Sequence, residues 1–162
     1  MDFKEEFAAN GEHVINGGEL LDKLPFDEWL IYVQNNSNIE TVSDDWVLTD
    51  IFFACDENEI VGVISFRHNL NDFLNDWGHI GFSVRPSKRC NGIATWMLSQ
   101  IIYHASVLGI NSLQLSCYDD NIASKKTILN NRGEYVRNFY YLGKKVNVYM
   151  ISIENFRYIT KL

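Results

Sequence analysis

The amino-acid sequence predicts an α/β fold, in which one domain holds a mixed, mostly antiparallel sheet flanked by helices. Apolar residues recur at helical spacing in Pro25–Asn35 and again in Gly92–Leu108. Two β-rich segments separated by a short polar turn indicate an antiparallel hairpin. A predicted strand on each side of the longer helix indicates a crossover connection, which adds a parallel pair to the sheet.

The first part of the chain is predicted to be helical. The first ten residues form a helix that ends at Asn10-Gly11, because glycine accepts the positive φ found beyond a helix C-terminus. Residues 11–19 contain three glycines and are typical of a loop. A second helix runs from Pro25 to about Asn35, with proline in its first turn and apolar side chains on one face.

Three strands are predicted next. Val47–Ala54 and Ile60–Phe66 form the hairpin around the polar turn Asp56-Glu57-Asn58. Residues 69–77 are rich in Asn and Asp and are predicted to be a polar connection. The third strand is His79–Arg85, which ends because proline follows it.

The remaining elements alternate between helix and strand. The helix Gly92–Leu108 is followed by Gly109 at the position of a C-cap glycine. The last predicted elements are a strand at Leu113–Cys117, a helix from Ile122 to about Asn131 with Asn121 as N-cap, and two strands near Tyr135–Tyr141 and Val146–Ile153.

Length and composition indicate one domain that covers residues 1–162. Apolar residues make up 46% of the chain and aromatic residues 14%, which is too apolar for a disordered protein. The net charge of −7 disfavours general binding to nucleic acid. No apolar stretch is long enough to cross a membrane and the charged start is unlike a signal peptide, so we expect a cytoplasmic protein. Three widely spaced cysteines without a CxxC pair predict no metal site.

The most informative segment is Gly81–Thr95, where a strand, a basic loop and a helix follow one another. The first amides of a helix lack intrahelical acceptors and lie at the positive end of the helix dipole, so they bind anions. Gly92 and Ala94 leave room for a pyrophosphate, while Lys88 and Arg89 add positive charge.

In this segment the chain resembles the GNAT acetyltransferase superfamily, through the signature Arg89-x-x-Gly92-x-Ala94 in its strand–loop–helix context. Gly78–Pro86 is similar to a subfamily of acetyltransferases with the motif GHIG[YF]SVRPS. The resemblance continues through Arg67-His68 and through Asp120–Ser124, so it covers most of the chain. It implies a GNAT fold that here lacks the usual first strand, and acetyl-CoA as the cofactor.

The resemblance also implies the residues that bind the cofactor. The amides of residues 90–95 would hold the pyrophosphate, and the end of the strand near Val84 would pair with the pantetheine arm as an added strand does. The Val84 amide would polarise the acetyl carbonyl. The full expected set is Val84, Arg85, Arg89, Cys90, Asn91, Gly92, Ile93, Ala94, Thr95, Asn121, Ser124 and Lys125. Asn121 can serve equally as a plain helix N-cap.

The general acid and base remain open at this stage. Many GNAT enzymes use a tyrosine in the helix after the Asn motif, and the matching residues Thr127–Asn131 contain none. Tyr141, or its neighbour Tyr140, could replace it, although tyrosines in strands more often serve packing. His79 and His68 are candidate bases because histidine titrates near neutrality, and each could equally be a structural histidine. Cys117 could line the thioester site or fill a small buried space.

The function implied is N-acetyl transfer from acetyl-CoA to a primary amine, here of a small molecule, by direct attack in a ternary complex. The alternative is a non-catalytic sensor or regulatory module that binds acyl-CoA, because the usual tyrosine is missing. The missing first strand would leave a sheet edge open, and a second copy of the chain could cover it to form a homodimer.

Overall fold

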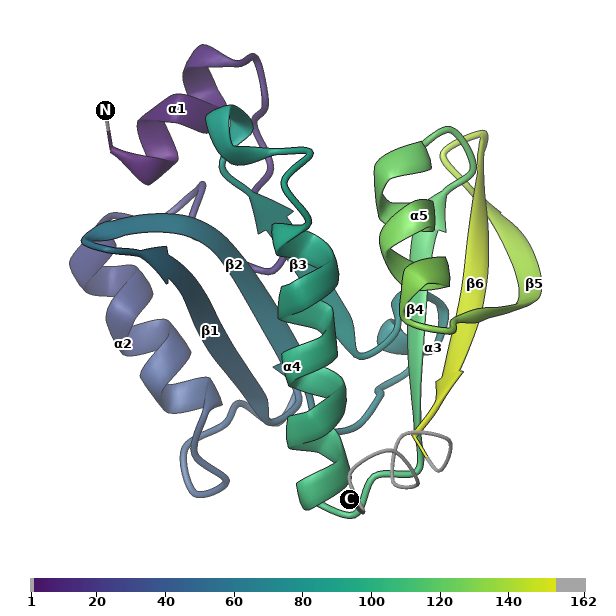
Figure 1. Cartoon of the computed structure of the whole chain (residues 1–162). Coiled ribbons are helices and arrows are strands. Elements are labelled where there is room, and N and C mark those ends of the chain that lie inside the picture. Colours follow the sequence, from purple (N-terminus) through teal and green to yellow (C-terminus); the bar gives the residue numbers. More distant parts are fainter. Residues whose placement is uncertain (1, 154–162) are drawn as a thin grey trace, which may run out of the picture. The chain divides into compact units, whose positions relative to one another are not determined.

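A computed structural model describes residues 2–153 of the chain (Figure 1). In chain order the elements are α1 (Phe3–Ala9), α2 (Phe26–Asn36), β1 (Thr49–Asp56), β2 (Glu59–Arg67), α3 (Leu74–Trp77), β3 (Ile80–Val84), the 3-10 turn η1 (Pro86–Lys88), α4 (Ile93–Val107), β4 (Ser112–Tyr118), α5 (Ile122–Asn130), β5 (Glu134–Tyr141) and β6 (Lys144–Ser152). They form two compact units, the first from residues up to 71 with 80–94, and the second from 72–79 with the described residues beyond 94.

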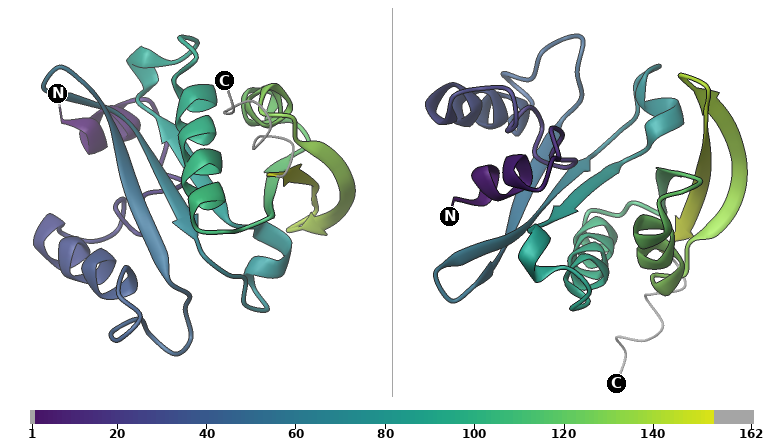
Figure 2. Two further views of the ribbon diagram at one scale, coloured as in Figure 1. Left: turned by 60° about the horizontal axis from the view of Figure 1, so that its bottom comes forward. Right: turned by 90° about the horizontal axis from the view of Figure 1, so that it is seen from above.

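The first unit contains an antiparallel sheet in the order β1-β2-β3. Its register pairs Phe53 with Val63 and Ser65 with Gly81. α1 and α2 lie on the same face of this sheet (Figure 2). Their apolar side chains form a core with Val63, and its buried members are Phe3, Phe7, Ile15, Leu21, Trp29 and Val63.

The α1–α2 segment, residues 10–25, is tied both to α2 and to the sheet. The indole Nε1 of Trp29 donates to the carbonyl oxygen of Gly18 at 2.7 Å. Glu19 forms an ion pair with Arg67 at the end of β2, and both side chains are largely buried. The Arg67 guanidinium also lies 5.9 Å from the centre of the Trp46 ring. Because these contacts come from different elements, they hold the segment in one position on the sheet.

Two glycines bring this segment close to the sheet. A Cβ on Gly17 would lie 2.3 Å from the carbonyl oxygen of Gly81 in β3, and Gly17 has φ of +83°. A Cβ on Gly81 would in turn lie 2.9 Å from the Gly17 nitrogen. The main chain of the α1–α2 segment therefore packs directly on the main chain of β3, which requires glycine on both sides.

The second unit contains an antiparallel sheet in the order β4-β6-β5. α3 and α5 each pack against β4. Trp77 at the end of α3 makes edge contacts with Tyr118, Phe139 and Tyr141, with ring centres 5.0–6.2 Å apart. The hairpin between β5 and β6 turns at Leu142-Gly143, where both residues have positive φ.

The predicted α/β class with antiparallel sheets flanked by helices is confirmed, and three details differ. The strands form two sheets rather than one, and every strand pair in them is antiparallel. The predicted polar connection contains α3, because Leu74 and Trp77 supply apolar contacts that its Asn and Asp residues obscured. β3 begins at Ile80, because the main-chain N–H of His79 donates to the carbonyl oxygen of Gln114 in β4 and not to β2.

Two further expectations concern the organisation of the chain. Among the described residues the first strand is β1, at Thr49, so none precedes α1 there. The domain range 1–162 includes residue 1 and residues 154–162, which lie outside the described residues, and a single domain stays a prediction.

The contact between the two glycines can be tested by mutation. We expect Gly17→Ala to lower the free energy of unfolding by about 2–4 kcal/mol, because the new Cβ overlaps the Gly81 carbonyl group. Gly11→Ala is the matched control, since Gly11 has φ of +75° with nothing within 4 Å of the added Cβ, and should cost only about 1 kcal/mol. Urea denaturation measures both, and equal losses would contradict the contact.

Candidate functional site

The end of β3, the cofactor loop (residues 85–92) and the start of α4 form one continuous stretch of the first unit. After Val84 the chain makes the 3-10 turn η1 and then reaches α4 at Ile93. Cys90 and Gly92 have positive φ, of 64° and 78°. The first amides of α4 lack intrahelical acceptors and, with the dipole of this 15-residue helix, are suited to bind an anion.

The outer edge of β3 presents main-chain groups away from β2. The amide of Arg85 donates to the carbonyl oxygen of Val61 at 2.9 Å, which makes these two a hydrogen-bonded pair. Such pairs alternate along an antiparallel ladder, so the main-chain groups of Ile80, Phe82 and Val84 point to the opposite edge. β3 is the last strand of its sheet, so this edge is suited to receive an extended ligand.

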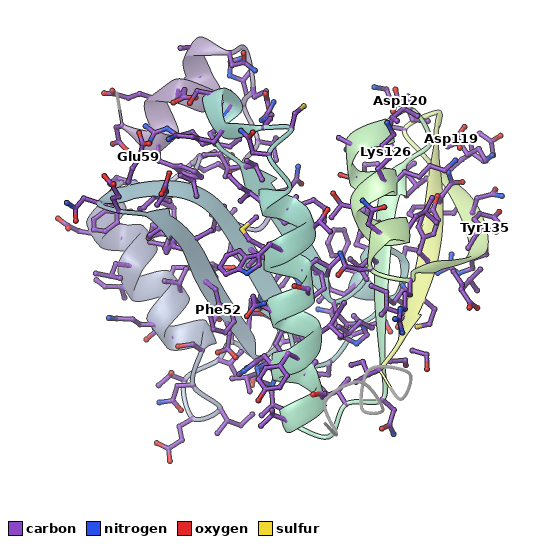
Figure 3. The ribbon with its side chains drawn as sticks, viewed as in Figure 1. Phe52, Glu59, Asp119, Asp120, Lys126 and Tyr135 are labelled. Atoms are coloured by element: carbon purple, nitrogen blue, oxygen red, sulfur yellow. The ribbon has the colours of Figure 1, made fainter. Side chains whose placement is uncertain are left out.

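Arg85 is one of the expected cofactor residues, and its side chain lies inside the first unit. The guanidinium is 4% exposed and donates to Glu6 and to Glu59, each at 2.6 Å. It also donates to the carbonyl oxygen of Ile60 at 3.2 Å. Its side chain therefore joins α1, the β1–β2 hairpin and the end of β3, and Figure 3 shows Glu59 at that end of the sheet.

Glu6 holds the cofactor loop directly. One carboxylate oxygen accepts from Arg85 and the other accepts the main-chain N–H of Ser87 at 2.6 Å. The bond from the Ser87 amide, followed by that from Arg85, lowers the pKa of Glu6 from 4.5 to about 2. Figure 1 shows α1 beside the turn that contains Ser87. The loop is therefore fixed from the side of α1 by a carboxylate that stays ionised.

Arg89, the first residue of the family signature, has its side chain bound to a carboxylate. Its Nη1 and Nη2 lie 2.6 and 2.8 Å from the two oxygens of Glu12. Its Nε donates to the carbonyl oxygen of Val84 at 3.0 Å. The hydrogen bonds from Arg89 lower the pKa of Glu12, and those to Glu12 raise the pKa of Arg89. Glu12 is thus the partner of Arg89.

Lys88 is likewise paired with acidic side chains. Its Nζ lies 3.1 Å from Glu59 and 3.7 Å from Asp56, both on the β1–β2 hairpin. A hydrogen bond to Glu59 raises the pKa of Lys88. Asn91 fixes the loop from within, since its side-chain amide donates to the carbonyl oxygens of Lys88 and Arg89.

The other expected cofactor residues lie in the second unit. The side chain of Asn121 accepts the N–H of Ser124 at 3.0 Å, so it is the N-cap of α5. Lys125 lies in the first turn of α5, near Asp119, Asp120 and Lys126, which are labelled in Figure 3. Thr95 in α4 accepts a hydrogen bond from Asn131 through its carbonyl oxygen. The cofactor role of these residues stays a prediction.

The two candidate histidines have different surroundings. His68 follows β2, its Nε2 lies 2.7 Å from a carboxylate oxygen of Asp50, and its ring packs on Phe66. His79 uses Nδ1 to accept the main-chain N–H of Gln114 at 3.0 Å. Neutral His79 therefore carries its hydrogen on Nε2, and it must give up this hydrogen bond to bind a second proton. The geometry is more favourable to His68 as a base.

Tyr141 and Cys117 both lie in the second unit, where packing against neighbouring side chains determines their positions. The Tyr141 ring meets the Trp77 ring edge-on with centres 5.0 Å apart, while Tyr140 is exposed. Cys117 is buried, and burial raises the pKa of its thiol to about 11. It therefore matches the expectation of a small buried filler.

The structure brings together Val84, Arg85, Arg89, Cys90, Asn91, Gly92, Ile93 and Ala94 within the first unit. The acidic partners of this stretch, Glu6 and Glu59, could not be predicted from the sequence, because they lie 79 and 26 residues from Arg85 in the chain. No group of three or more His, Cys, Asp or Glu side chains in residues 2–153 could hold a metal ion. None of the described helices is long and apolar enough to span a membrane.

Comparison with known proteins identifies the family of the chain and structures with a similar fold. Residues 19–130 match the model of the acetyltransferase (GNAT) family. No curated protein sequence matches the chain significantly.

Three solved structures illustrate the similarity of fold. RimL, a ribosomal alpha-N-protein acetyltransferase solved with coenzyme A, has a TM-score of 0.67 at 22% identity, over 94% of this chain and 85% of that one. The microcin self-immunity acetyltransferase MccE, solved with acetyl-CoA and AMP, has a TM-score of 0.66 at 19% identity, over 93% and 83%. An N-acetyltransferase from Staphylococcus aureus has a TM-score of 0.64 at 17% identity, over 80% and 78%.

The role of Glu6 predicts a pH dependence of stability. Its pKa in the folded protein is below its ordinary value, so its stabilising contribution is present above about pH 4.5 and is lost as the pH falls toward 2. We expect Glu6→Gln to be less stable than the native protein at pH 7, and the difference to shrink between pH 4.5 and 2. Urea denaturation across this range measures it.

The control for this experiment is Glu28→Gln, which removes an exposed carboxylate in the first turn of α2. This variant should differ little from the native protein at any pH. If the difference in unfolding free energy between Glu6→Gln and the native protein stays constant from pH 7 to pH 2, the Glu6 carboxylate does not stabilise the fold through its charge.

Proposed function

The chain belongs to the GNAT family of acetyltransferases, and on this premise we propose that it transfers the acetyl group of acetyl-CoA to a primary amine. The observation that carries the proposal is the continuous stretch from β3 to α4. Its outward main-chain edge suits the extended pantetheine arm, and the helix start that follows suits a pyrophosphate. Solved structures with the same fold contain acetyl-CoA or coenzyme A.

The proposed reaction is a direct attack in a ternary complex. The amine nitrogen forms a bond to the acetyl carbonyl carbon, and the bond from that carbon to sulfur breaks. The nitrogen loses a proton to a base, and the thiolate that leaves takes up a proton to become a thiol. The N–H of Val84 points to the outer edge of β3, where it could donate to the developing oxyanion.

We assign the base to His68 in preference to His79 and Tyr141. The Asp50 carboxylate lies 2.7 Å from Nε2 of His68 and orients the ring, as a carboxylate orients histidine bases in general. His79 is held by a main-chain hydrogen bond. Tyr141 is a partly exposed tyrosine on an edge strand, and we keep it as the candidate acid for the leaving thiolate.

The acceptor is proposed to be the amine of a small molecule. A net charge of −7 favours the approach of a cationic acceptor. RimL, which shares the fold, acts on a protein, so a protein N-terminus is the competing class of acceptor. A cytoplasmic location and a homodimer are further parts of the proposal and follow from the sequence alone.

Binding of acetyl-CoA can be tested at Gly92. We expect Gly92→Asp to weaken acetyl-CoA binding at least tenfold in calorimetric titration, because it places a negative charge beside the first turn of α4. Gly109→Asp is the matched control, since Gly109 lies at the other end of the helix, also has φ of +78° and has nothing within 4 Å of an added Cβ. If the two variants bind acetyl-CoA with equal affinity, the cofactor loop is not part of the acetyl-CoA site.

The assignment of the base can be tested by turnover. With a panel of amines as acceptors, we expect His68→Asn to lower kcat at least a hundredfold while acetyl-CoA affinity stays the same. His79→Asn and Tyr141→Phe test the other two candidates in the same assay of thiol release. If native protein binds acetyl-CoA but releases no thiol with any amine, the non-catalytic acyl-CoA-binding alternative is favoured.

A further inference from the structure

The basic side chains of the cofactor loop are all paired within the first unit. Arg85, Lys88 and Arg89 face four carboxylates, those of Glu6, Glu12, Asp56 and Glu59. The positive charge that the sequence places beside the expected pyrophosphate is therefore compensated by the protein itself. A phosphate that took Arg89 as its ligand would have to displace a bidentate carboxylate.

The side chain of Arg89 is folded back along its own chain. Nε–H binds the carbonyl oxygen of Val84, five residues earlier, and both terminal nitrogens bind Glu12. The guanidinium carbon lies 5.6 Å from the centre of the Phe7 ring in α1. These three contacts, with β3, the α1–α2 segment and α1, fix the orientation of the guanidinium.

Glu12 connects this arginine to the α1–α2 segment. Its main-chain N–H donates to the carbonyl oxygen of Phe7 at 2.9 Å, and its side chain also accepts from Asn10 at 2.6 Å. Five residues later, Gly17 packs on Gly81 in β3. The segment therefore touches β3 through Gly17 and the cofactor loop through Glu12, at two ends of the same stretch of main chain.

We propose that Glu12 and Arg89 are a positioning pair, which fixes the cofactor loop to the α1–α2 segment and leaves phosphate binding to main-chain amides. Nε of Arg89 also donates to the carbonyl oxygen of Val84 at the outer edge of β3. A ligand that pairs with this edge as an added strand therefore makes its last main-chain hydrogen bond with the Val84 N–H. The pair thereby sets where an extended ligand leaves β3 and turns toward the start of α4. This inference rests on the proposed binding of acetyl-CoA.

The alternative is that Arg89 is a phosphate ligand and Glu12 competes with the phosphate. The two roles predict opposite signs for one substitution. If Glu12 positions the loop, Glu12→Gln weakens binding. If Glu12 competes with the cofactor, Glu12→Gln frees the guanidinium and tightens binding.

The experiment is calorimetric titration of the full chain with coenzyme A and with acetyl-CoA. We expect Glu12→Gln and Arg89→Gln each to weaken binding by a similar factor, about three- to fivefold for a partly exposed pair. The double variant should be no weaker than either single variant, because both break the same interaction. The charge-swapped variant, Glu12→Arg with Arg89→Glu, should recover part of the affinity.

Glu28→Gln is the control for the loss of one carboxylate and should bind like the native protein. Tighter binding by Glu12→Gln would overturn the proposal. A much larger loss in Arg89→Gln than in Glu12→Gln would also overturn it, because Arg89 would then contact the phosphates.

Amide hydrogen exchange without any ligand separates this inference from the proposed function. We expect the amides of residues 85–92 to exchange faster in Glu12→Gln than in native protein, and those of β5 and β6 to be unchanged. Native protein that fails to bind acetyl-CoA would refute the proposed function while this result still stands. Unchanged exchange in residues 85–92 would refute the pair as a positioning device.

Discussion

The first unit depends on one buried guanidinium. Arg85 follows β3 directly, and its charge is compensated by Glu6 from α1 and Glu59 from the β1–β2 hairpin. A buried guanidinium that lost one partner would cost about 3–5 kcal/mol, less here because Glu59 is partly exposed. The helix, the hairpin and the strand must therefore meet at one point, and the cofactor loop starts from that point.

The fold could be predicted from local signals because each is encoded over a few residues. Apolar spacing located α2 and α4, and Gly109 and Asn121 marked a helix end and a helix start. Pairing between distant strands has no such local signal, which explains why one mixed sheet was expected and two antiparallel sheets were found. The short helix α3 was missed because two apolar residues among Asn and Asp are too few to show a period.

In the candidate site, too, the local features could be predicted from the sequence and the long-range contacts could not. The loop geometry could be expected from Gly92 and the strand–loop–helix order, since backbone conformation depends on nearby residues. The partners of Arg85 and Arg89 could not, because Glu6 and Glu12 lie almost eighty residues away. The sequence alone therefore predicts that both arginines contact a ligand, and it gives no sign of the carboxylates that bind them in the structure. The hydrogen bond that occupies His79 was hidden for the same reason.

The outward edge of β3 has a consequence for how such a protein can diverge. Main-chain groups are the same in every residue except proline, so mutations at Ile80, Phe82 and Val84 leave the edge chemically unchanged as long as the strand persists. Natural selection would then act on residues that shape the backbone, such as Gly17, Gly81 and Gly92, more strongly than on the side chains of this edge. This fits a fold shared at 17–22% identity with RimL, MccE and the staphylococcal enzyme.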